Sequence, residues 1–467
     1  MKIGVFTIAA KNYLAYVRVL MNSIARVHPE YERFLCLTDT VDGCFDDSEE
    51  PFRVIEAATI GVPTFADMAL RYDVMEFSTA LKPSMIRWLL QNTELDLIIY
   101  LDPDIAAYSR FDAIERAFSA GASVALTPHI TAPLEDGCEP NDHHILQSGV
   151  FNLGFVAVRR GQEAAAFLAW WARRLATQAE ANFSANLFTD QRWCDLAPCF
   201  LDRLAIIKDP GYNVAYWNLK ERHLDQDTQG AWLANGQPLA FFHFSGVRAN
   251  NPQLLSRHQN RYTWENLPQL RPLFDAYRSE LLAHGAAVVG RWPYAYDTLC
   301  GTSVFLHMRL LYRETHAQPS TWEGQALHDH LVALCSEAAD LPDFPSAPQI
   351  TRLMHRIHQS RPDLLLTFNL MTPEGQTSFD GWFRSSAAAE YPLAEMLLPL
   401  ARAPAPVPQA APALVPPVAA DDHAGVSQAR ELLRPLWRSL DATQRETLAP
   451  LALALLRKRV ATRQGRT

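Results

Sequence analysis

The first 260 residues alternate between short apolar runs and stretches in which apolar residues recur at helical spacing. The apolar runs at residues 2–8, 34–38 and 54–57 predict strands, and the spacing over residues 14–27 predicts an amphipathic helix. Strands that alternate with helices favour right-handed βαβ units and a parallel sheet covered by helices. We therefore expect an α/β fold with a Rossmann-like, mixed but mainly parallel sheet flanked by helices.

The clearest strand is predicted at residues 97–101, where five apolar residues occur in a row. Two carboxylates follow it directly, in the sequence Asp102-Pro103-Asp104. In open α/β sheets ligands bind beyond the carboxyl ends of the strands, and side chains two apart on an extended chain project to the same side. Two carboxylates held together favour a divalent cation, Mn²⁺ or Mg²⁺, which would in turn bind a diphosphate. The alternative is a surface turn, because Asp and Pro are common turn residues.

Further elements are expected as far as residue 246. They are a helical pattern over 65–90 with a restart at 78–83, helices at 111–120 and 163–179, and strands at 123–126, 150–158 and 239–246. Residues 127–147 form an unusually long loop, which predicts an active-site flap or an acceptor-binding loop. The histidines of this loop, His129, His143 and His144, have no metal-binding spacing, and we interpret them as loop residues.

Polar residues near the N-terminus are candidates for binding a nucleotide. Asn12 and Tyr13 follow the first predicted strand, where they could hydrogen-bond or stack on a nucleobase. The alternative is a turn residue followed by a helix-capping aromatic. Lys82 precedes a proline that suits a first helical turn, and it could reach a phosphate unless it is simply solvated.

A second set of polar residues is a candidate for binding a sugar and a metal. Asn152 lies in a strand interrupted by a glycine, which often marks the close approach of a ligand. Asp190 and Gln191 offer a carboxylate and an amide together. His243 ends an apolar strand and is a candidate third metal ligand, although a histidine in an aromatic run is more often a packed core residue. Gly246 would let backbone N–H groups approach a phosphate.

Composition limits the class of protein. A hydrophobic content of 48% and a charged content of 20% are those of an ordinary soluble globular protein, and 467 residues allow about two or three domains. A net charge of -9 gives no support for a nucleic-acid partner. The seven cysteines are odd in number and contain no Cys-x-x-Cys, which fits reduced thiols in a cytoplasm. Because no apolar run reaches about 18 residues, we expect no membrane-spanning segment.

Taken in order, these motifs resemble the GT-A glycosyltransferases, particularly the bacterial-type family 8 galactosyltransferase and glycogenin group. The resemblance covers about residues 1–260, and it is carried by Ala9-Ala10-Lys11-Asn12-Tyr13, Ala80-Leu81-Lys82, Tyr100-Leu101-Asp102-Pro103-Asp104, Phe151-Asn152-Leu153-Gly154, Asp190-Gln191 and His243-Phe244-Ser245-Gly246. It implies a GT-A fold in which Asp102, Asp104 and His243 hold Mn²⁺. It further implies a base beside Asn12 and Tyr13 and phosphates near Lys82. The transferred sugar would lie near Asn152, Asp190 and Gln191.

The chain departs from that family at two positions. The family usually has an acidic residue at the base-binding position where this chain has Ala10. Its His-x-x-Gly motif normally continues to Lys-Pro-Trp, whereas here Gly246 is followed by Val247 and Arg248. Arg248 is the candidate for the missing lysine, although Arg and Lys differ in reach and donor geometry. Either change fits another nucleotide sugar or a distant subgroup.

The chain beyond residue 260 predicts further helices and a tail. Residues 1–260 form the expected nucleotide-sugar-binding domain, and residues 261–400 form a helical subdomain with helices at 270–286, 304–315, 324–339, 350–360 and 387–401. Residues 401–425 are a Pro/Ala-rich linker, and residues 426–467 are short helices that end in a basic tail. The tail is either a contact for an anionic membrane or a protein partner, or a solvated end.

The predicted function is metal-dependent transfer of a sugar from a nucleotide-diphosphate donor to a glycan, lipid-linked or protein acceptor. Asp190, with Gln191 beside it, is the candidate for orienting the sugar at the reacting centre. The resemblance implies retention of anomeric configuration and a place in bacterial surface glycan (polysaccharide) assembly, with a cytoplasmic location or a peripheral one at the inner membrane. Two other classes stay open. They are a nucleotidyltransferase, for which no Gly-rich phosphate loop is found, and a non-catalytic glycan- or partner-binding protein.

Overall fold

The computed structural model describes residues 1–393 and 397. The described chain forms two compact units. The first comprises Met1–Asp297 and Ala317–Thr321, and the second comprises Thr298–His316 and the described residues from Trp322 onward. The predicted linker at 401–425 and the predicted basic tail at 426–467 lie outside the described residues, as does most of the predicted helix at 387–401.

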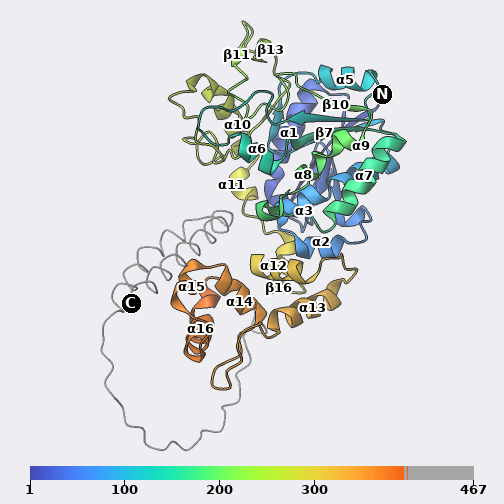
Figure 1. Cartoon of the computed structure of the whole chain (residues 1–467). Coiled ribbons are helices and arrows are strands. Elements are labelled where there is room, and N and C mark those ends of the chain that lie inside the picture. Colours follow the sequence, from blue (N-terminus) through green and yellow to red (C-terminus); the bar gives the residue numbers. More distant parts are fainter. Residues whose placement is uncertain (394–396, 398–467) are drawn as a thin grey trace, which may run out of the picture. The chain divides into compact units, whose positions relative to one another are not determined.

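The first unit is built on a seven-stranded sheet (Figure 1). Its strands are β1 (Ile3–Ala9), β2 (Glu32–Leu37), β3 (Arg53–Glu56), β4 (Leu97–Leu101), β6 (Val124–Pro128), β7 (Phe151–Arg159) and β10 (Leu204–Ile206). They lie in the order β10-β6-β7-β4-β1-β2-β3. Only β7 runs antiparallel to its neighbours, β4 and β6, and the other neighbouring pairs are parallel. The predicted mixed, mainly parallel sheet is confirmed.

Helices cover both faces of this sheet. They are α1 (Leu14–Val27), α2 (Phe65–Arg71), α3 (Val74–Ala80), α4 (Lys82–Asn92), α5 (Asp112–Ser119), α7 (Gln162–Leu175), α8 (Gln191–Cys194), α9 (Ala197–Phe200) and α11 (Ala286–Val289). On one face Phe6 and Tyr100 join an apolar cluster with α2, α3, α4 and α7. On the other face Val5 and Ile99 join a cluster with α1 and α5. Because alternate residues of a strand face different helical layers, the central strands are continuous apolar runs.

A short strand pair lies apart from the main sheet. β5 (Ile105–Ala107) pairs antiparallel with β14 (Phe241–His243), and His243 stands opposite Ile105. Phe242 of β14 packs with Phe274 of α10 (Arg271–Ala283) in a third apolar cluster. The strand predicted at 239–246 is therefore shorter than expected and belongs to this pair, which carries His243 to the end of β4.

Two local predictions missed a helix start because a capping residue was not recognised. The helical pattern over 65–90 is three helices, and the predicted restart at 78–83 matches the boundary between α3 and α4. The earlier break was missed: the Asp73 side chain accepts hydrogen bonds from the N–H groups of Met75 and Glu76 and so starts a new helix at α3. The long loop at 127–147 contains α6 (Asp142–Ser148), whose N-cap Asn141 accepts from the N–H of His144.

Smaller hairpins complete the first unit. They are β8 (Ala181–Asn182) with β9 (Leu187–Phe188), and β11 (Leu224–Gln226) with β12 (Trp232–Ala234) and β13 (Gln237–Pro238).

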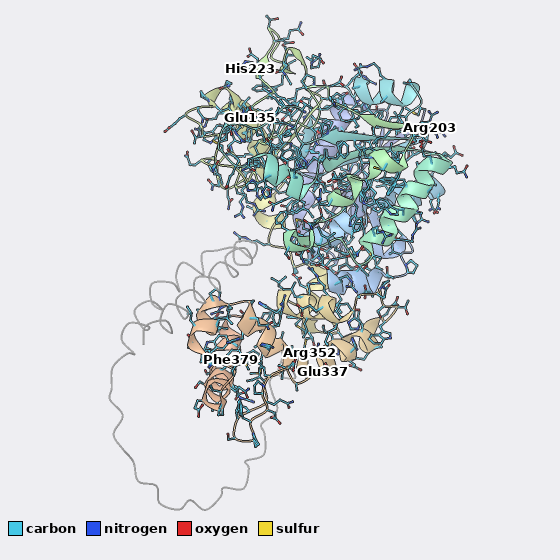
Figure 2. All side chains as sticks on the ribbon, viewed as in Figure 1. Glu135, Arg203, His223, Glu337, Arg352 and Phe379 are labelled. Atoms are coloured by element: carbon cyan, nitrogen blue, oxygen red, sulfur yellow. The ribbon has the colours of Figure 1, made fainter. Side chains whose placement is uncertain are left out.

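The second unit is mainly helical. It contains β15 (Thr298–Leu299), β16 (Thr302–Ser303), α12 (Leu306–Thr315), α13 (Gly324–Ser336), α14 (Arg352–Gln359), α15 (Pro362–Thr367) and α16 (Pro373–Ser386). Arg352 at the start of α14 pairs with Glu337 just after α13 at 2.6 Å (Figure 2). The helices α15 and α16 were not predicted, although each begins at a proline, which suits a first helical turn. Within the described residues, no helix has the length and apolar character that a bilayer crossing requires.

Candidate active site

Three side chains from separate parts of the chain converge beyond the carboxyl end of β4. The ligand atoms of Asp102, Asp104 and His243 all lie within 4.8 Å of one another. His243 Nε2 is 3.0 Å from Asp104 Oδ1 and 3.6 Å from Asp102 Oδ2. The structure thus brings together the three residues for which the sequence predicted a shared metal.

The two aspartates are brought together by a turn. The Ile105 N–H donates to the Asp102 carbonyl at 3.1 Å, which closes a four-residue turn with Pro103 at its second position. The expectation that an extended backbone aligns the two carboxylates was wrong, because the chain reverses here to enter β5. A turn and a metal site are therefore compatible here, because the turn directs both carboxylates towards His243.

Asp102 is fixed from two sides. The buried Tyr100 hydroxyl donates to Asp102 Oδ1 at 2.6 Å, and the Asp102 N–H donates to the Gly154 carbonyl at 2.9 Å. Burial and the neighbouring Asp102 carboxylate raise the pKa of Tyr100 well above its usual range, so this phenol stays a donor. Asp102 Oδ2 is left facing His243.

Gly154 makes room for the imidazole. A Cβ at this position would lie 2.5 Å from His243 Cε1 and 2.7 Å from His243 Nδ1. The glycine in β7 therefore marks the close approach of a side chain, where the sequence suggested the approach of a ligand.

Asn213 selects the tautomer of His243. The Asn213 amide nitrogen donates to Thr127 Oγ1 at 2.8 Å and to Asn152 Oδ1 at 2.9 Å, which fixes the orientation of the amide. Its oxygen then lies 3.3 Å from His243 Nδ1 and accepts that proton. A histidine that donates through one ring nitrogen offers the lone pair of the other to a metal, so Nε2 is the ligand atom.

We expect Asn213→Gly to weaken Mn²⁺ binding roughly 10- to 100-fold, as loss of an outer-shell partner does in other metal sites. Glycine is the cleanest replacement because Asn213 has a φ of 51°, which glycine adopts without strain. Isothermal titration calorimetry with Mn²⁺ measures the effect. Asn235→Gly is the matched control: the φ of Asn235 is 49°, and its side chain accepts a hydrogen bond from the N–H of His223. Equal affinities for the two variants would show that Asn213 does not orient the ligand.

The charges of the centre are coupled. Burial alone would raise the pKa of Asp104, but the charge and the hydrogen bond of His243 lower it overall. For His243 the signs are reversed: burial lowers its pKa, but Asp104 outweighs burial, so that the pKa is raised overall. Two carboxylates therefore share one positive charge here, and a divalent cation would take the place of the imidazolium proton.

Lys82 and Asp190 form a buried ion pair beside the centre. Lys82 Nζ lies 2.6 Å from Asp190 Oδ2, and both side chains are almost fully buried. The same Nζ donates to the Leu153 carbonyl at 2.7 Å and lies 4.1 Å from the centre of the Tyr100 ring. Burial raises the pKa of Asp190 against the opposing charge of Lys82. The structure thus gives Lys82 an internal carboxylate partner and does not leave it solvated.

Asn152 and Gln191 belong to a polar network under the centre. Gln191 accepts from the Leu153 N–H at 3.0 Å and donates to the Ser148 carbonyl at 2.7 Å. The Asn152 amide nitrogen lies 3.1 Å from His129 Nε2, and burial lowers the pKa of His129 to about 4. His129 directly follows β6, in the predicted loop, and is a neutral, buried member of this network. These contacts brace the side chains predicted to face the sugar, and contact with the sugar itself stays a prediction.

The remaining predicted binding residues lie on the segments that follow β1 and β14. Tyr13 is 46% exposed and stacks on Tyr16 at 4.6 Å between ring centres, next to the partly exposed Asn12. Gly246 has a φ of 77°, in the left-handed region that favours glycine. Arg248 is exposed. Contact of these residues with a nucleotide stays a prediction.

A groove borders the 127–147 segment. It has a volume of about 450 Å³ and is lined by Pro128, Ile130, Thr131, Ala132, Pro133, Asp142, Val150, Phe151, Ile206 and Lys208. Its lining includes the two residues that precede Asn152 in the chain. The predicted acceptor-binding segment therefore flanks a hollow at the start of β7, the strand that carries Asn152.

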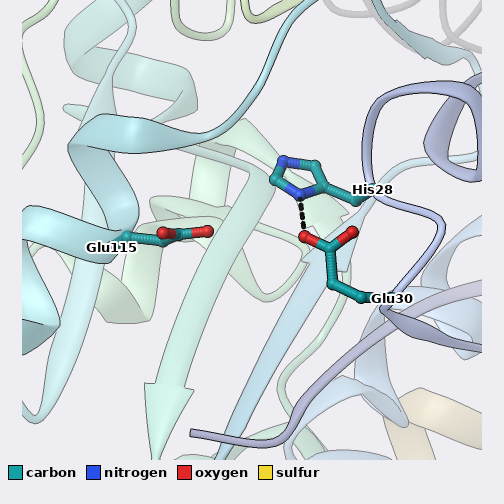
Figure 3. Close-up of side chains that lie close together, drawn as sticks. All are labelled: His28, Glu30 and Glu115. Atoms are coloured by element: carbon teal, nitrogen blue, oxygen red, sulfur yellow. Dashed lines mark hydrogen bonds and ion pairs between the residues drawn. The ribbon is translucent and has the colours of Figure 1, made fainter.

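A second cluster with metal-ligand chemistry occurs at His28, Glu30 and Glu115 (Figure 3). His28 Nε2 accepts from the Phe111 N–H at 2.9 Å, so Nδ1 carries the proton and donates to Glu30 at 3.1 Å. Both carboxylates also pair with Arg110. Because neither ring nitrogen is free and both carboxylates already have an arginine partner, this cluster is structural.

We expect His28→Leu to lower the free energy of unfolding by about 1–3 kcal/mol, because it leaves the buried Phe111 N–H without an acceptor. Burial lowers the pKa of His28, so the unfolded chain takes up this proton before the folded chain does as the pH falls. The stability that neutral His28 contributes is therefore lost below about pH 6.5. The free energy of unfolding of the variant should fall less steeply with decreasing pH than that of the wild type. Urea denaturation at pH values on both sides of 6.5 measures both effects. The exposed His223→Leu is the control, and equal pH slopes for wild type and His28→Leu would contradict the assignment.

Two residues of the centre were missed in the sequence. Tyr100 reads only as part of an apolar strand, and Asn213 follows an Asp-Pro-Gly-Tyr turn. The signal available for Asn213 was its residue type, since Asn is favoured in the left-handed conformation that it adopts.

Comparisons with known proteins find distant likenesses. No protein-family model matches the chain. It is 22% identical to YfnF of Bacillus subtilis (strain 168) over 284 residues, which are 60% of this chain and 92% of that protein. It is 25% identical to YfnD of the same organism over 174 residues, which are 37% of this chain and 53% of that protein. Both relatives are named as uncharacterized proteins.

Among solved structures, the likenesses include three glycosyltransferases. The galactosyltransferase LgtC, in complex with donor and acceptor sugar analogues, is 15% identical and matches 59% of this chain and 99% of its own, with a TM-score of 0.34. GlyE of Streptococcus pneumoniae TIGR4 is 14% identical and matches 64% of this chain and 66% of its own, with a TM-score of 0.36. The bifunctional WbbM is 12% identical and matches 61% of this chain and 51% of its own, with a TM-score of 0.37. At these identities and TM-scores the likeness does not by itself assign a function to this chain.

Proposed function

We propose that this chain is a metal-dependent glycosyltransferase that moves a sugar from a nucleotide-diphosphate donor to an acceptor hydroxyl. One observation carries the proposal. Asp102, Asp104 and Nε2 of His243 converge beyond the carboxyl ends of a mainly parallel sheet, where α/β folds bind their ligands.

The ligand set fits Mn²⁺, with Mg²⁺ as the alternative. Carboxylate oxygens are the ligands that both cations prefer, and an imidazole nitrogen adds a preference for a transition metal. The outer partners match this use, because Tyr100 and Asn213 each orient one ligand. In the resemblance to GT-A enzymes, the same three residues hold the metal.

The residues around the centre suggest how the transfer is organised. When bound, the cation would supply the positive charge that stabilises the departing nucleoside diphosphate. Asp102, Asp104 and His243 hold that position, and Arg248 lies on the same segment as Gly246. Asp190 is a buried carboxylate whose position Lys82 fixes, and we assign it to orienting the sugar or stabilising positive charge at its anomeric carbon. Retention of configuration is part of the proposal through the family 8 resemblance.

The acceptor side and the location are proposed from nearby features. The groove beside the 127–147 segment can accept the non-reacting part of a glycan, lipid-linked or protein acceptor. The seven cysteines are free thiols, which supports a cytoplasmic enzyme that assembles bacterial surface glycans, soluble or peripheral at the inner membrane.

The experiment is a thermal-shift screen of nucleoside diphosphates with and without Mn²⁺. A ligand that binds only the folded state raises the melting temperature, so at least one nucleoside diphosphate should do so in the presence of Mn²⁺. Cleavage of the matching nucleotide sugars is then followed by chromatography. Cleavage to free sugar and nucleoside diphosphate supports the proposal, and release of pyrophosphate from nucleoside triphosphate and sugar phosphate would assign a nucleotidyltransferase instead. Stabilisation without turnover on any donor would indicate a binding protein.

A further inference from the structure

We propose that Arg257 binds the diphosphate of the donor and supplies the positive charge that the missing Lys-Pro-Trp lysine would otherwise provide. This inference rests on the proposed function and adds a residue to it. Arg257 lies outside every motif identified in the sequence, and three observations lead to it: its place in the fold, the charges around it and its lack of an acidic partner.

The fold returns the segment of Arg257 to the metal centre. The Ser256 hydroxyl donates to the Ser245 carbonyl at 2.8 Å, and the Arg257 N–H donates to the Gly246 carbonyl at 3.4 Å. A Cβ on Gly246 would lie 2.6 Å from Ser256 Oγ and 3.2 Å from Arg257 Cγ. The stem of the Arg257 side chain thus packs on Gly246, three residues beyond His243. Only a glycine at position 246 permits this approach.

The Arg257 guanidinium and the Asp104 carboxylate shift the pKa of the same three tyrosines. Burial raises the pKa of Tyr13, Tyr16 and Tyr216, in the case of Tyr16 to about 12. In each of the three, the Asp104 charge raises the pKa further and the Arg257 charge lowers it. The charges of Arg257 and Asp104 therefore act with opposite sign on the same three tyrosines.

Arg257 is not neutralised by the protein. Other arginines of this region have carboxylate partners. Arg261 forms two hydrogen bonds with Asp136, at 2.7 and 2.9 Å, and Arg278 pairs with Asp275 at 3.3 Å. Arg257 is exposed, and its Nε donates to His258 Nε2 at 3.1 Å. Within residues 1–393 it has no carboxylate at ion-pair distance, so both terminal nitrogens can donate to a ligand. An unpaired guanidinium next to a metal centre, in a chain of net charge -9, favours an anionic ligand.

The chemistry of the ligand follows from these groups. A diphosphate bound to a divalent cation leaves oxygens that the carboxylate ligands do not contact. The planar fork of a guanidinium matches two such oxygens, whereas an ammonium group acts as a point charge. Arg257 can therefore replace a lysine that the chain lacks, although it comes from a later segment.

Inorganic pyrophosphate with Mn²⁺ is the probe, because it contains the proposed ligand group without a base or a sugar. We expect Arg257→Ala to weaken its binding about 10- to 100-fold in calorimetry, as loss of charge-assisted hydrogen bonds does. Arg257→Lys should bind with intermediate affinity. Binding of Mn²⁺ alone, followed by electron paramagnetic resonance, should match wild type in both variants, and so should the melting temperature without ligand. The exposed Arg53→Ala, on β3 at the edge of the sheet, is the matched control.

The outcomes separate this inference from the proposed function. Wild-type binding of Mn²⁺ and pyrophosphate that is unchanged in Arg257→Ala overturns the role of Arg257 and leaves the proposed function in place. Absence of Mn²⁺-dependent pyrophosphate binding in the wild type overturns the proposed function itself. A loss of affinity that is equal in Arg257→Ala and Arg53→Ala assigns the effect to net charge and also overturns the inference.

Discussion

Asp104→Asn is expected to lower Mn²⁺ affinity by about 100-fold or more and donor cleavage by about 10²–10³-fold, since a catalytic metal supplies several kcal/mol of charge stabilisation. Asp104 is the carboxylate closest to His243 Nε2, at 3.0 Å, and its removal leaves the centre with one anionic ligand. The substitution keeps the shape of the side chain, so the turn between β4 and β5 should persist. Electron paramagnetic resonance of Mn²⁺ and sugar release from a nucleotide sugar measure the two effects.

The matched control for this substitution is Asp202→Asn, an exposed aspartate between α9 and β10. It removes the same charge from the chain at a position outside the centre, and its Mn²⁺ affinity should equal that of the wild type. If Asp104→Asn bound Mn²⁺ as tightly as the control, the cation would have to be held elsewhere.

Lys82→Met is expected to lower the free energy of unfolding by about 3–5 kcal/mol, because it leaves the Asp190 carboxylate buried without its partner. Both side chains of the pair are at most 2% exposed, so water cannot replace the lost contact. Urea denaturation measures the change. The double variant Lys82→Met with Asp190→Leu should recover most of the stability, since an apolar pair of similar volume carries no unpaired charge.

An exposed ion pair provides the comparison. Lys2 and Glu94 lie 2.6 Å apart with side chains that are 61% and 85% exposed, so Lys2→Ala should leave the stability unchanged within error. A loss for Lys82→Met no larger than that for Lys2→Ala would mean that the buried pair does not stabilise the fold. Failure of the double variant to recover would show instead that the lysine stem, and not its charge, supports α4.

The parts of the fold that depend on local pattern were predictable. The strand at 97–101 was found because its side chains are buried on both faces, and the rule for the carboxyl ends of strands then located Asp102 and Asp104. The helix at 14–27 was found with the bounds that the structure gives, because its apolar stripe is continuous. Helix breaks set by one capping side chain, as at Asp73 and Asn141, do not alter the apolar pattern and were missed.

The parts of the site that depend on long-range contacts were not predictable. The burial of Lys82 was not predictable, because its partner Asp190 is more than a hundred residues away and the start of a helix usually faces water. Asn213 meets His243 only because Val214 and Phe242 bridge as neighbouring backbones. Arg257 could not be placed without the return of its segment to Gly246. A single sequence indicates which residues have suitable chemistry, whereas burial and partners come from the fold.

The pairing of β5 with β14 has a consequence for motion at the centre. His243 is carried by a ladder of three residue pairs that is separate from the seven-stranded sheet. Because this ladder is separate, we expect the backbone amides of β5 and β14 to exchange through a local opening that leaves the seven-stranded sheet folded. A bound cation would oppose this local opening. Its presence would then slow hydrogen exchange at a few backbone amides of these two strands and leave the exchange of the main sheet as it was.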